Sequence, residues 1–114
     1  MPAPDELRVS ADRRTLTVSF GTERFSIPAE LLRVESPSAE VQGHDPSQKK
    51  LVAGKRDVTI AAIHPTGNYA VRIVFGDGHD TGHYTWNELE RFGRDRDRMM
   101  AAYEAALAAA GRER

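Results

Sequence analysis

Strict alternation of apolar and polar residues is the feature of this sequence that most restricts its fold. It runs through residues 15–20 (TLTVSF), where every second residue is apolar and the others carry hydroxyl groups. Because successive side chains of a β-strand point to opposite sides, the pattern is typical of an antiparallel strand with one buried face. The alternation resumes at residues 24–27 after a break of hairpin length, and residues 7–9 alternate as well. The first third of the chain therefore predicts a meander of three short strands.

The middle of the chain breaks this regularity before strands and helices return. Pro28 ends the third strand, and residues 29–33 have the composition of a helical turn. Residues 35–56 have no periodicity, and loops of that length are usually functional or disordered. The later elements are predicted as strands at residues 58–63, 69–75 and 83–86, a short helix over residues 88–92 with Asn87 as N-cap, and a longer helix over residues 95–110.

These elements add up to an α+β fold. We expect a mainly antiparallel sheet of five or six strands, with a short helix after the third strand and the C-terminal helices packed on the sheet. The length of 114 residues is that of one domain. Residues 1–92 form the body of this domain, and residues 93–114 form an alanine-rich helix that packs on it or extends it.

The composition excludes several classes of protein. The chain has 16 basic and 17 acidic residues, and this balance gives no reason to expect nucleic acid as a partner. No apolar run approaches the roughly 18 residues of a membrane span. Residues 1–6 (MPAPDE) lack the basic and apolar regions of a secretion signal. We therefore expect a cytoplasmic protein that binds neither membranes nor nucleic acids.

The sequence contains no recognisable catalytic constellation. It has no cysteine, which removes thiolate nucleophiles, disulfides, iron–sulfur ligation and thiolate zinc sites. No Gly-x-Ser-x-Gly elbow is present, and residues 76–78 (GDG) carry an acid where a phosphate-binding loop needs free amides and a lysine. His79 and His83 are four residues apart in a glycine-rich turn and not on a helix, so the helical zinc motif is absent. These observations favour a protein that is not an enzyme.

Three aromatic residues are candidates for a binding surface. Tyr69, Tyr84 and Trp86 lie in or next to the predicted strands, and Tyr and Trp are enriched at the energetic centres of protein interfaces. Aromatic residues on strands also fill sheet cores, so packing is the alternative role for all three.

Four segments and two aromatic residues occur in an order that resembles a known family. They are residues 27–33 (IPAELLR), 36–43 (SPSAEVQG), 67–71 (GNYAV) and 75–82 (FGDGHDTG), followed by Tyr84 and Trp86. Together they resemble the small domain at the N-terminus of gamma-butyrobetaine hydroxylase, which also occurs as a stand-alone bacterial protein. The resemblance covers residues 5–92 and leaves out the alanine-rich C-terminal helix.

The resemblance implies a zinc site whose ligands are mostly replaced here. In the hydroxylases, the domain holds a structural zinc through Cys-x-Cys-x-x-Cys and the histidine of an Asp-Gly-His turn. These positions correspond to Ser36, Ser38, Val41 and His79 in this chain. A serine hydroxyl stays protonated at neutral pH and valine has no donor atom, so His79 is the one ligand left and we expect no cofactor. The oxygenase activity of the full-length relatives resides in a separate catalytic domain and is not carried over.

The resulting functional prediction is an accessory module that binds a protein partner. A similar domain accompanies Mrp-type P-loop ATPases that carry iron–sulfur clusters, so the resemblance implies such an ATPase, or an oxygenase system, as the partner. The predicted binding residues lie in the long loop and in the following set: Tyr69, Asp77, Gly78, His79, Tyr84 and Trp86.

Two alternative functions stay open at this point. One is residual zinc or iron binding in an oxidoreductase-associated protein, centred on His79 with substitute ligands drawn from His44, His83 or Asp77. The other is the binding of a small molecule in a pocket beside the glycine-rich turn.

Overall fold

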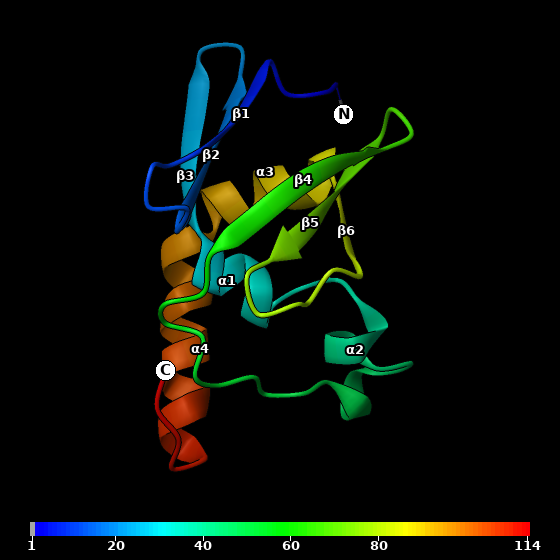
Figure 1. Cartoon of the computed structure of the whole chain (residues 1–114). Coiled ribbons are helices and arrows are strands. Elements are labelled where there is room, and N and C mark those ends of the chain that lie inside the picture. Colours follow the sequence, from blue (N-terminus) through cyan, green and yellow to red (C-terminus); the bar gives the residue numbers. More distant parts are fainter. Residues whose placement is uncertain (1) are drawn as a thin grey trace.

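The computed structural model describes residues 2–114, which form two small antiparallel sheets and five helical segments (Figure 1). The first sheet has the order β1-β2-β3, with β1 at Glu6–Val9, β2 at Thr15–Phe20 and β3 at Glu23–Pro28. The second has the order β4-β5-β6, with β4 at Ile60–Thr66, β5 at Ala70–Phe75 and β6 at Gly82–Thr85. The helical segments are α1 at Ala29–Val34, α2 at Ala39–Gln42, the 3-10 helix η1 at Pro46–Gln48, α3 at Trp86–Arg94 and α4 at Arg96–Ala109.

The α+β class and the N-terminal meander are confirmed, but the strands do not form the single sheet of five or six strands that we expected. The division follows from the connection between β3 and β4. Pro28, which has no amide hydrogen, ends β3, and the chain continues into α1 and a long connection. When β4 begins, the amide of Ile60 bonds to Arg13 in the β1–β2 turn, so β4 does not add to the edge of β3.

Arg13 connects the two sheets. Its backbone oxygen accepts a hydrogen bond from the amide of Ile60 at 2.7 Å. Its guanidinium group donates to the carbonyl oxygens of Ile60 and Ala61 at 2.6 and 2.7 Å. The φ angle of Arg13 is 62°, the one positive value among the non-glycine residues of the described chain. This left-handed conformation closes the β1–β2 turn and places Arg13 against the start of β4.

One apolar core lies between the sheets and the helices. Its largest fully buried side chains include Tyr84 of β6, Phe75 of β5 and Phe92 of α3. Helix α3, which crosses behind β4 and β5 in Figure 1, contacts β2 and β3 of the first sheet and β6 of the second. The two sheets therefore belong to one packed unit, although no strand pairing joins them.

Helix α3 begins earlier than predicted, and its N-cap is Thr85 and not Asn87. The Thr85 hydroxyl accepts a hydrogen bond from the amide of Glu88 at 3.2 Å, and the Glu88 carboxylate accepts one from the amide of Thr85 at 3.0 Å. This capping box is encoded by the Thr-x-x-Glu pattern at residues 85–88. The strand predicted at residues 83–86 therefore ends at Thr85, and Trp86 is the first residue of α3.

Helix α4 and the residues after it pack against α1 and the long connection. Tyr103 of α4 contacts the cluster around Val34 of α1, and its hydroxyl donates to the carbonyl oxygen of Val52 at 2.6 Å. The chain then folds back, so that Arg114 forms a bidentate ion pair with buried Glu30. No helix within residues 2–114 is long and apolar enough to cross a membrane.

Candidate functional site

The long connection and the β5–β6 turn meet at a largely buried polar cluster. We call it the His79 cluster, and its members are Ser36, Ser38, Glu40, His79 and Thr81. Ser36, Ser38 and His79 are buried, and Glu40 comes from the first turn of α2. Two side-chain hydrogen bonds join the segments directly: Ser36 Oγ lies 3.0 Å from His79 Nε2, and Ser38 Oγ lies 2.6 Å from Thr81 Oγ1.

His79 also links Ser36 to Glu40. Its Nδ1 atom lies 3.0 Å from Glu40 Oε2. An ionised carboxylate can only accept a hydrogen bond, so Nδ1 carries the proton and Nε2 accepts from the Ser36 hydroxyl. Both nitrogens of the neutral ring are therefore paired.

The order Ser36–His79–Glu40 has the connectivity of a serine-hydrolase triad, which no motif in the sequence indicates. The exposure of its members is the reverse of what acyl transfer needs. Ser36 is 0% exposed, whereas the side chain of Glu40 is 60% exposed. A substrate carbonyl has to reach the serine oxygen, and the acid that orients the histidine is normally buried. The geometry therefore supports a structural link between the two segments.

Asp77 anchors the turn that carries His79. Its carboxylate accepts a hydrogen bond from Arg33 Nε at 2.9 Å and lies 2.6 Å from Lys55 Nζ. It also accepts one from the backbone amide of His79 at 3.1 Å. Partial burial alone would raise the pKa of Asp77, but these donors outweigh it and lower the pKa to about 2. Asp77 therefore stays ionised at neutral pH and holds α1, the segment before β4 and the β5–β6 turn together.

Burial lowers the pKa of His79 below the usual value of 6.5, and the positive charge of Arg33 adds to this effect. The carboxylates of Glu40 and Asp77 act in the opposite direction but do not cancel it. The ring is therefore neutral at physiological pH, in agreement with its hydrogen bonds.

Gly78 completes the turn. It has a φ angle of 94°, in the region that favours glycine. The amide of Gly78 donates to the carbonyl oxygen of Phe75 at 3.0 Å. The amide of Phe75 in turn donates to the carbonyl oxygen of His79 at 2.9 Å. These bonds fix the position of His79 at the end of the turn.

The positions that the resemblance assigns to zinc lie at this cluster. Ser36 contacts His79, Ser38 contacts the β5–β6 turn, and Val41 is buried in α2. These residues do not fit a zinc ion, because two neutral hydroxyls and a valine stand where three thiolates are needed. Across residues 2–114, no three His, Asp or Glu side chains converge as metal ligands.

The substitute ligands considered for His79 are exposed or engaged elsewhere. His44 is exposed on the long connection, and His83 lies on the exposed side of β6, where its Nδ1 atom is 2.9 Å from Thr66 Oγ1. The carboxylate of Asp77 already forms ion pairs with the side chains of Arg33 and Lys55. The structure does not bring these side chains together with His79 as a ligand set.

The three candidate aromatic residues have different environments. Tyr84 is completely buried, and its hydroxyl donates to the carbonyl oxygen of Leu32 at 2.5 Å. Burial raises the pKa of Tyr84, so the hydroxyl stays protonated. Tyr69 is 58% exposed in the β4–β5 turn. Trp86 is partly exposed, and its indole N–H donates to the carbonyl oxygen of Asn68 in the same turn at 3.1 Å. Tyr69 and Trp86 are thus available at one turn, whereas Tyr84 belongs to the core.

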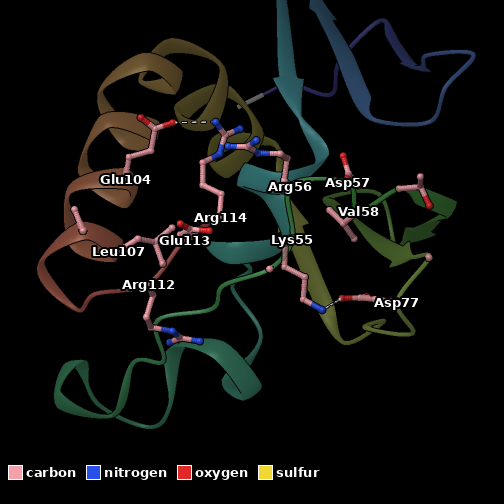
Figure 2. Close-up of a pocket in the computed structure, with 14 residues that line it drawn as sticks. Lys55, Arg56, Asp57, Val58, Asp77, Glu104, Leu107, Arg112, Glu113 and Arg114 are labelled. Carbon is pink, nitrogen blue, oxygen red and sulfur yellow. Dashed lines mark ion pairs between the residues drawn. The ribbon is translucent and has the colours of Figure 1, made fainter.

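An open groove lies beside the glycine-rich turn, where residues 54–59, Gly76 and Asp77 face α4 and the C-terminal residues (Figure 2). Its volume is about 880 Å³. The lining contains four basic and four acidic side chains. Two ion pairs within it, Lys55 with Asp77 and Arg114 with Glu104, are visible in Figure 2. The charges of this groove are therefore balanced.

Comparison with known proteins identifies the family. A family model described as "Gamma-butyrobetaine hydroxylase-like, N-terminal" matches residues 7–90. The chain belongs to this family. The part that matches the gamma-butyrobetaine hydroxylase-like model includes the His79 cluster and nearly all of both sheets, and it ends within α3.

Solved structures of similar proteins share the fold. Two proteins with NMR solution structures are 42% and 43% identical to this chain, with TM-scores of 0.87 and 0.85. Both comparisons cover 100% of this chain, and they cover 90% and 86% of the other chains. A crystal structure of a DUF971 family protein of unknown function from Acidithiobacillus ferrooxidans is 34% identical, with a TM-score of 0.66, over 79% of this chain and 91% of that one. No match was found among curated proteins.

Some residues of the site could not be selected from the sequence. Glu40, Thr81 and Arg33 are polar residues of ordinary type in loops or short helices, and their roles depend on contacts with residues about forty positions away. The one available signal was Asp77, because an acid in a tight glycine-rich turn needs a positively charged or N–H partner.

Proposed function

We propose that this domain is a non-catalytic accessory module that binds a protein partner through the β4–β5 turn and acts in the cytoplasm. The observation that carries the proposal is Tyr69, a large aromatic side chain that is 58% exposed at the tip of a hairpin. A tyrosine offers a large contact area and loses little conformational freedom on binding, so it is favoured at the centres of interfaces.

The turn restrains Tyr69 before any partner binds. The φ angle of Gly67 is 53°, and the amide of Tyr69 donates to the carbonyl oxygen of Thr66 at 3.4 Å. A Cβ atom on Gly67 would lie 3.0 Å from the ring of Tyr69, so the ring packs closely on the turn. The bond from Trp86 to Asn68 ties the same turn to α3. Such order in the free protein lowers the entropic cost of binding.

The partner class that we propose is the one that the family resemblance implies, an Mrp-type P-loop ATPase with an iron–sulfur cluster or an oxygenase system. The domain has no cysteine, so it contributes contacts and no thiolate ligands to such a cluster.

Site-specific photocrosslinking in cells tests this proposal. One variant carries p-benzoylphenylalanine at Tyr69, and a matched control carries it at Ala101, an exposed residue of α4. We expect position 69 to capture one protein that position 101 does not capture, and we expect that protein to be an ATPase or oxygenase of the proposed class. The same proteins at both positions, or none at Tyr69, would contradict partner binding. A single partner of another class would contradict only the assignment of its class.

The proposal includes no metal cofactor. Elemental analysis of protein purified without a histidine tag is expected to give less than about a tenth of an equivalent of zinc or iron. A full equivalent that disappears in the His79→Asn variant would support the metal-binding alternative instead.

The groove beside the glycine-rich turn favours a second candidate function, the binding of a small molecule. Its volume of about 880 Å³ lies within the range of ligand pockets. A thermal-shift screen of metabolites tests it, because a ligand at 100 times its Kd adds about 2.7 kcal/mol of stability. The Ala108→Trp variant fills part of the groove and is expected to remove the shift. An equal shift in this variant would place the ligand elsewhere.

A further inference from the structure

A second, smaller groove lies between α4 and residues 49–52, on a different side of this helix. Its volume is about 390 Å³. Ala102 and Ala106 are one helical turn apart and face this groove, whereas Glu104 and Ala108 face the first one. The apolar residues that line it are Val34, Leu51, Val52, Met99, Ala102 and Ala106.

The floor of this groove offers apolar contact. Tyr103 also lines the groove but is almost fully buried, and its hydroxyl is already bonded to the carbonyl oxygen of Val52. Met99 is partly buried, and methionine adapts its shape to different apolar partners. A ligand on this floor would therefore be held by apolar side chains and not by a set of converging polar groups.

The rim of the groove is positively charged. The basic residues in its lining are Lys49, Lys50, Arg91 and Arg98, and the acidic one is Glu35. Glu35 is neutralised by Lys49, whose Nζ atom lies 2.6 Å from its carboxylate. Lys50 and Arg91 form no ion pair with any residue in the range 2–114, and Arg98 pairs with Asp95 outside the lining. The larger groove has balanced charges and the whole chain has a net charge of -1, so this excess of positive charge is local.

We propose that this groove binds an acidic amphipathic helix of another protein. The apolar side chains of that helix would lie on the floor formed by α4 and residues 51–52, and its carboxylates would face Lys50, Arg91 and Arg98. Helices that bind grooves in this way place apolar residues every three or four positions, and charge complementarity at the rim sets their specificity. A single-stranded nucleic acid fits this surface less well, because its bases need exposed aromatic faces and Tyr103 is buried.

This inference does not depend on the function proposed for the β4–β5 turn. The two surfaces share no residue, since one consists of Tyr69 and Trp86 and the other of Arg91 together with residues on α4, α1 and the long connection. If the proposed function of the β4–β5 turn is contradicted, the proposal for this groove is unaffected, and the reverse also holds.

A designed peptide tests the inference directly. The probe is a fluorescent helical peptide of about four turns, with leucine at spacings of three and four and glutamate at the other positions; a second peptide has lysine in place of every glutamate. We expect the glutamate peptide to bind at least about tenfold more tightly than the lysine peptide, and to weaken as the salt concentration rises from about 50 to about 300 mM. In a nitrogen-15 NMR titration, the largest amide shifts are expected at residues 50–52 and 99–106.

Two pairs of variants provide matched controls. Ala102→Trp fills the groove and is expected to weaken binding at least about tenfold, whereas Ala105→Trp changes an exposed alanine that lines neither groove and is expected to leave it unchanged. Lys50→Glu is expected to weaken binding by a similar factor, whereas Arg56→Glu changes the net charge equally in the other groove and is expected to have little effect. Thermal unfolding of all four variants checks that each is folded.

Several results would overturn the inference. Equal binding of the two peptides, equal binding by Ala102→Trp and the wild type, or amide shifts confined to another surface would each do so. A wild-type dimer in sedimentation that Ala102→Trp dissociates would show that a second copy of this chain fills the groove. Anionic vesicles or RNA that require Lys50 and Arg91, while the glutamate peptide does not bind, would show a different ligand class.

Discussion

Arg13 holds a left-handed backbone conformation in the β1–β2 turn while its main chain and side chain both bond to β4. For a residue with a Cβ atom, this conformation costs about 1–2 kcal/mol relative to an ordinary one. The hydrogen bonds to Ile60 and Ala61 offset that cost, because they satisfy carbonyl groups at the start of β4, which is an edge strand of its sheet. A single residue thus couples the two sheets.

Replacing Arg13 with alanine and with glycine separates the two effects. Both variants lose the guanidinium bonds, but only alanine keeps the unfavourable backbone conformation. We expect both to be less stable than the wild type, and the Arg13→Ala variant to be less stable than Arg13→Gly by about 1 kcal/mol. Urea unfolding measures the difference. An alanine variant as stable as the glycine variant would mean that the turn relaxes when the guanidinium is absent.

His79 makes the stability of the protein depend on pH. Its native pKa is lower than 6.5, so above pH 6.5 the ring is neutral in both the native and the unfolded state. As the pH falls below 6.5, the unfolded chain binds a proton that the native protein does not bind, and the free energy of unfolding decreases until the pH reaches the native pKa. This loss is separate from that of Asp77, whose stabilisation is lost only as the pH falls from 3.8 towards 2.

We expect the free energy of unfolding to decrease as the pH falls through 6.5, and this decrease to be smaller in the His79→Gln variant. The His44→Gln variant, which changes an exposed histidine outside the His79 cluster, is the control with which the slope of His79→Gln is compared. Urea unfolding at a series of pH values measures both slopes. If His79→Gln and the wild type had the same slope, the protonation of another group would be responsible.

At the scale of elements, hydrogen bonds connect the two segments that a zinc ion connects in the hydroxylase domain. The segment with α2 and the β5–β6 turn are joined through Ser36, Ser38 and His79, at the positions that the resemblance assigns to zinc ligands. Ser36 Oγ is 3.0 Å from His79 Nε2, a hydrogen-bond distance, so this pair of positions is already in direct contact. We therefore expect the backbone to accept a zinc ion if cysteines stand at the three positions that the resemblance assigns to thiolate ligands.

Restoring the thiolates tests this statement. We expect the triple variant Ser36→Cys, Ser38→Cys, Val41→Cys to bind one zinc ion and to gain thermal stability when zinc is added. Adding His79→Asn to the triple variant is expected to weaken zinc binding, because the fourth ligand is lost. Cobalt spectroscopy and elemental analysis report the site. A triple variant that binds no zinc would show that α2 has moved away from the ligand geometry.

The elements that the sequence predicted well are those governed by local patterns. Alternation at residues 15–20 and 24–27 located β2 and β3, whereas the predicted N-cap, Asn87, lies two residues after Thr85, the N-cap that belongs to the Thr-x-x-Glu pattern at residues 85–88. The separation into two sheets was not predictable in this way, because it depends on the contact of Arg13 with Ile60, forty-seven positions away. The role of Glu40 was not predictable for the same reason, because its partner His79 is thirty-nine positions away in the sequence.

At the scale of the whole molecule, the shared core predicts how the protein unfolds. Both sheets contribute to one cluster of buried residues, and α3 contacts both. Exposing the core face of one sheet would therefore expose that of the other, and small domains built in this way unfold in one cooperative step. The smaller cluster around Tyr103 adds α4 to the same body through α1.

We expect a single unfolding transition for the whole chain. The fluorescence of Trp86, the one tryptophan, reports on the second sheet and α3, whereas far-ultraviolet circular dichroism reports on all elements. The two probes are expected to give the same midpoint in urea, within error. An earlier midpoint for Trp86 would indicate that the second sheet unfolds independently.

The division into two sheets also has a practical consequence for dissecting the chain. Each sheet is built from consecutive strands, and the exposed residues 44–48 lie between them in the sequence. A chain cut there yields two fragments, each with a complete meander but with only part of the core. Neither fragment can bury its apolar face alone, so the two should reassemble when mixed. The fold is therefore suited to a split-protein reporter, in which bringing the two halves together restores the native fluorescence of Trp86.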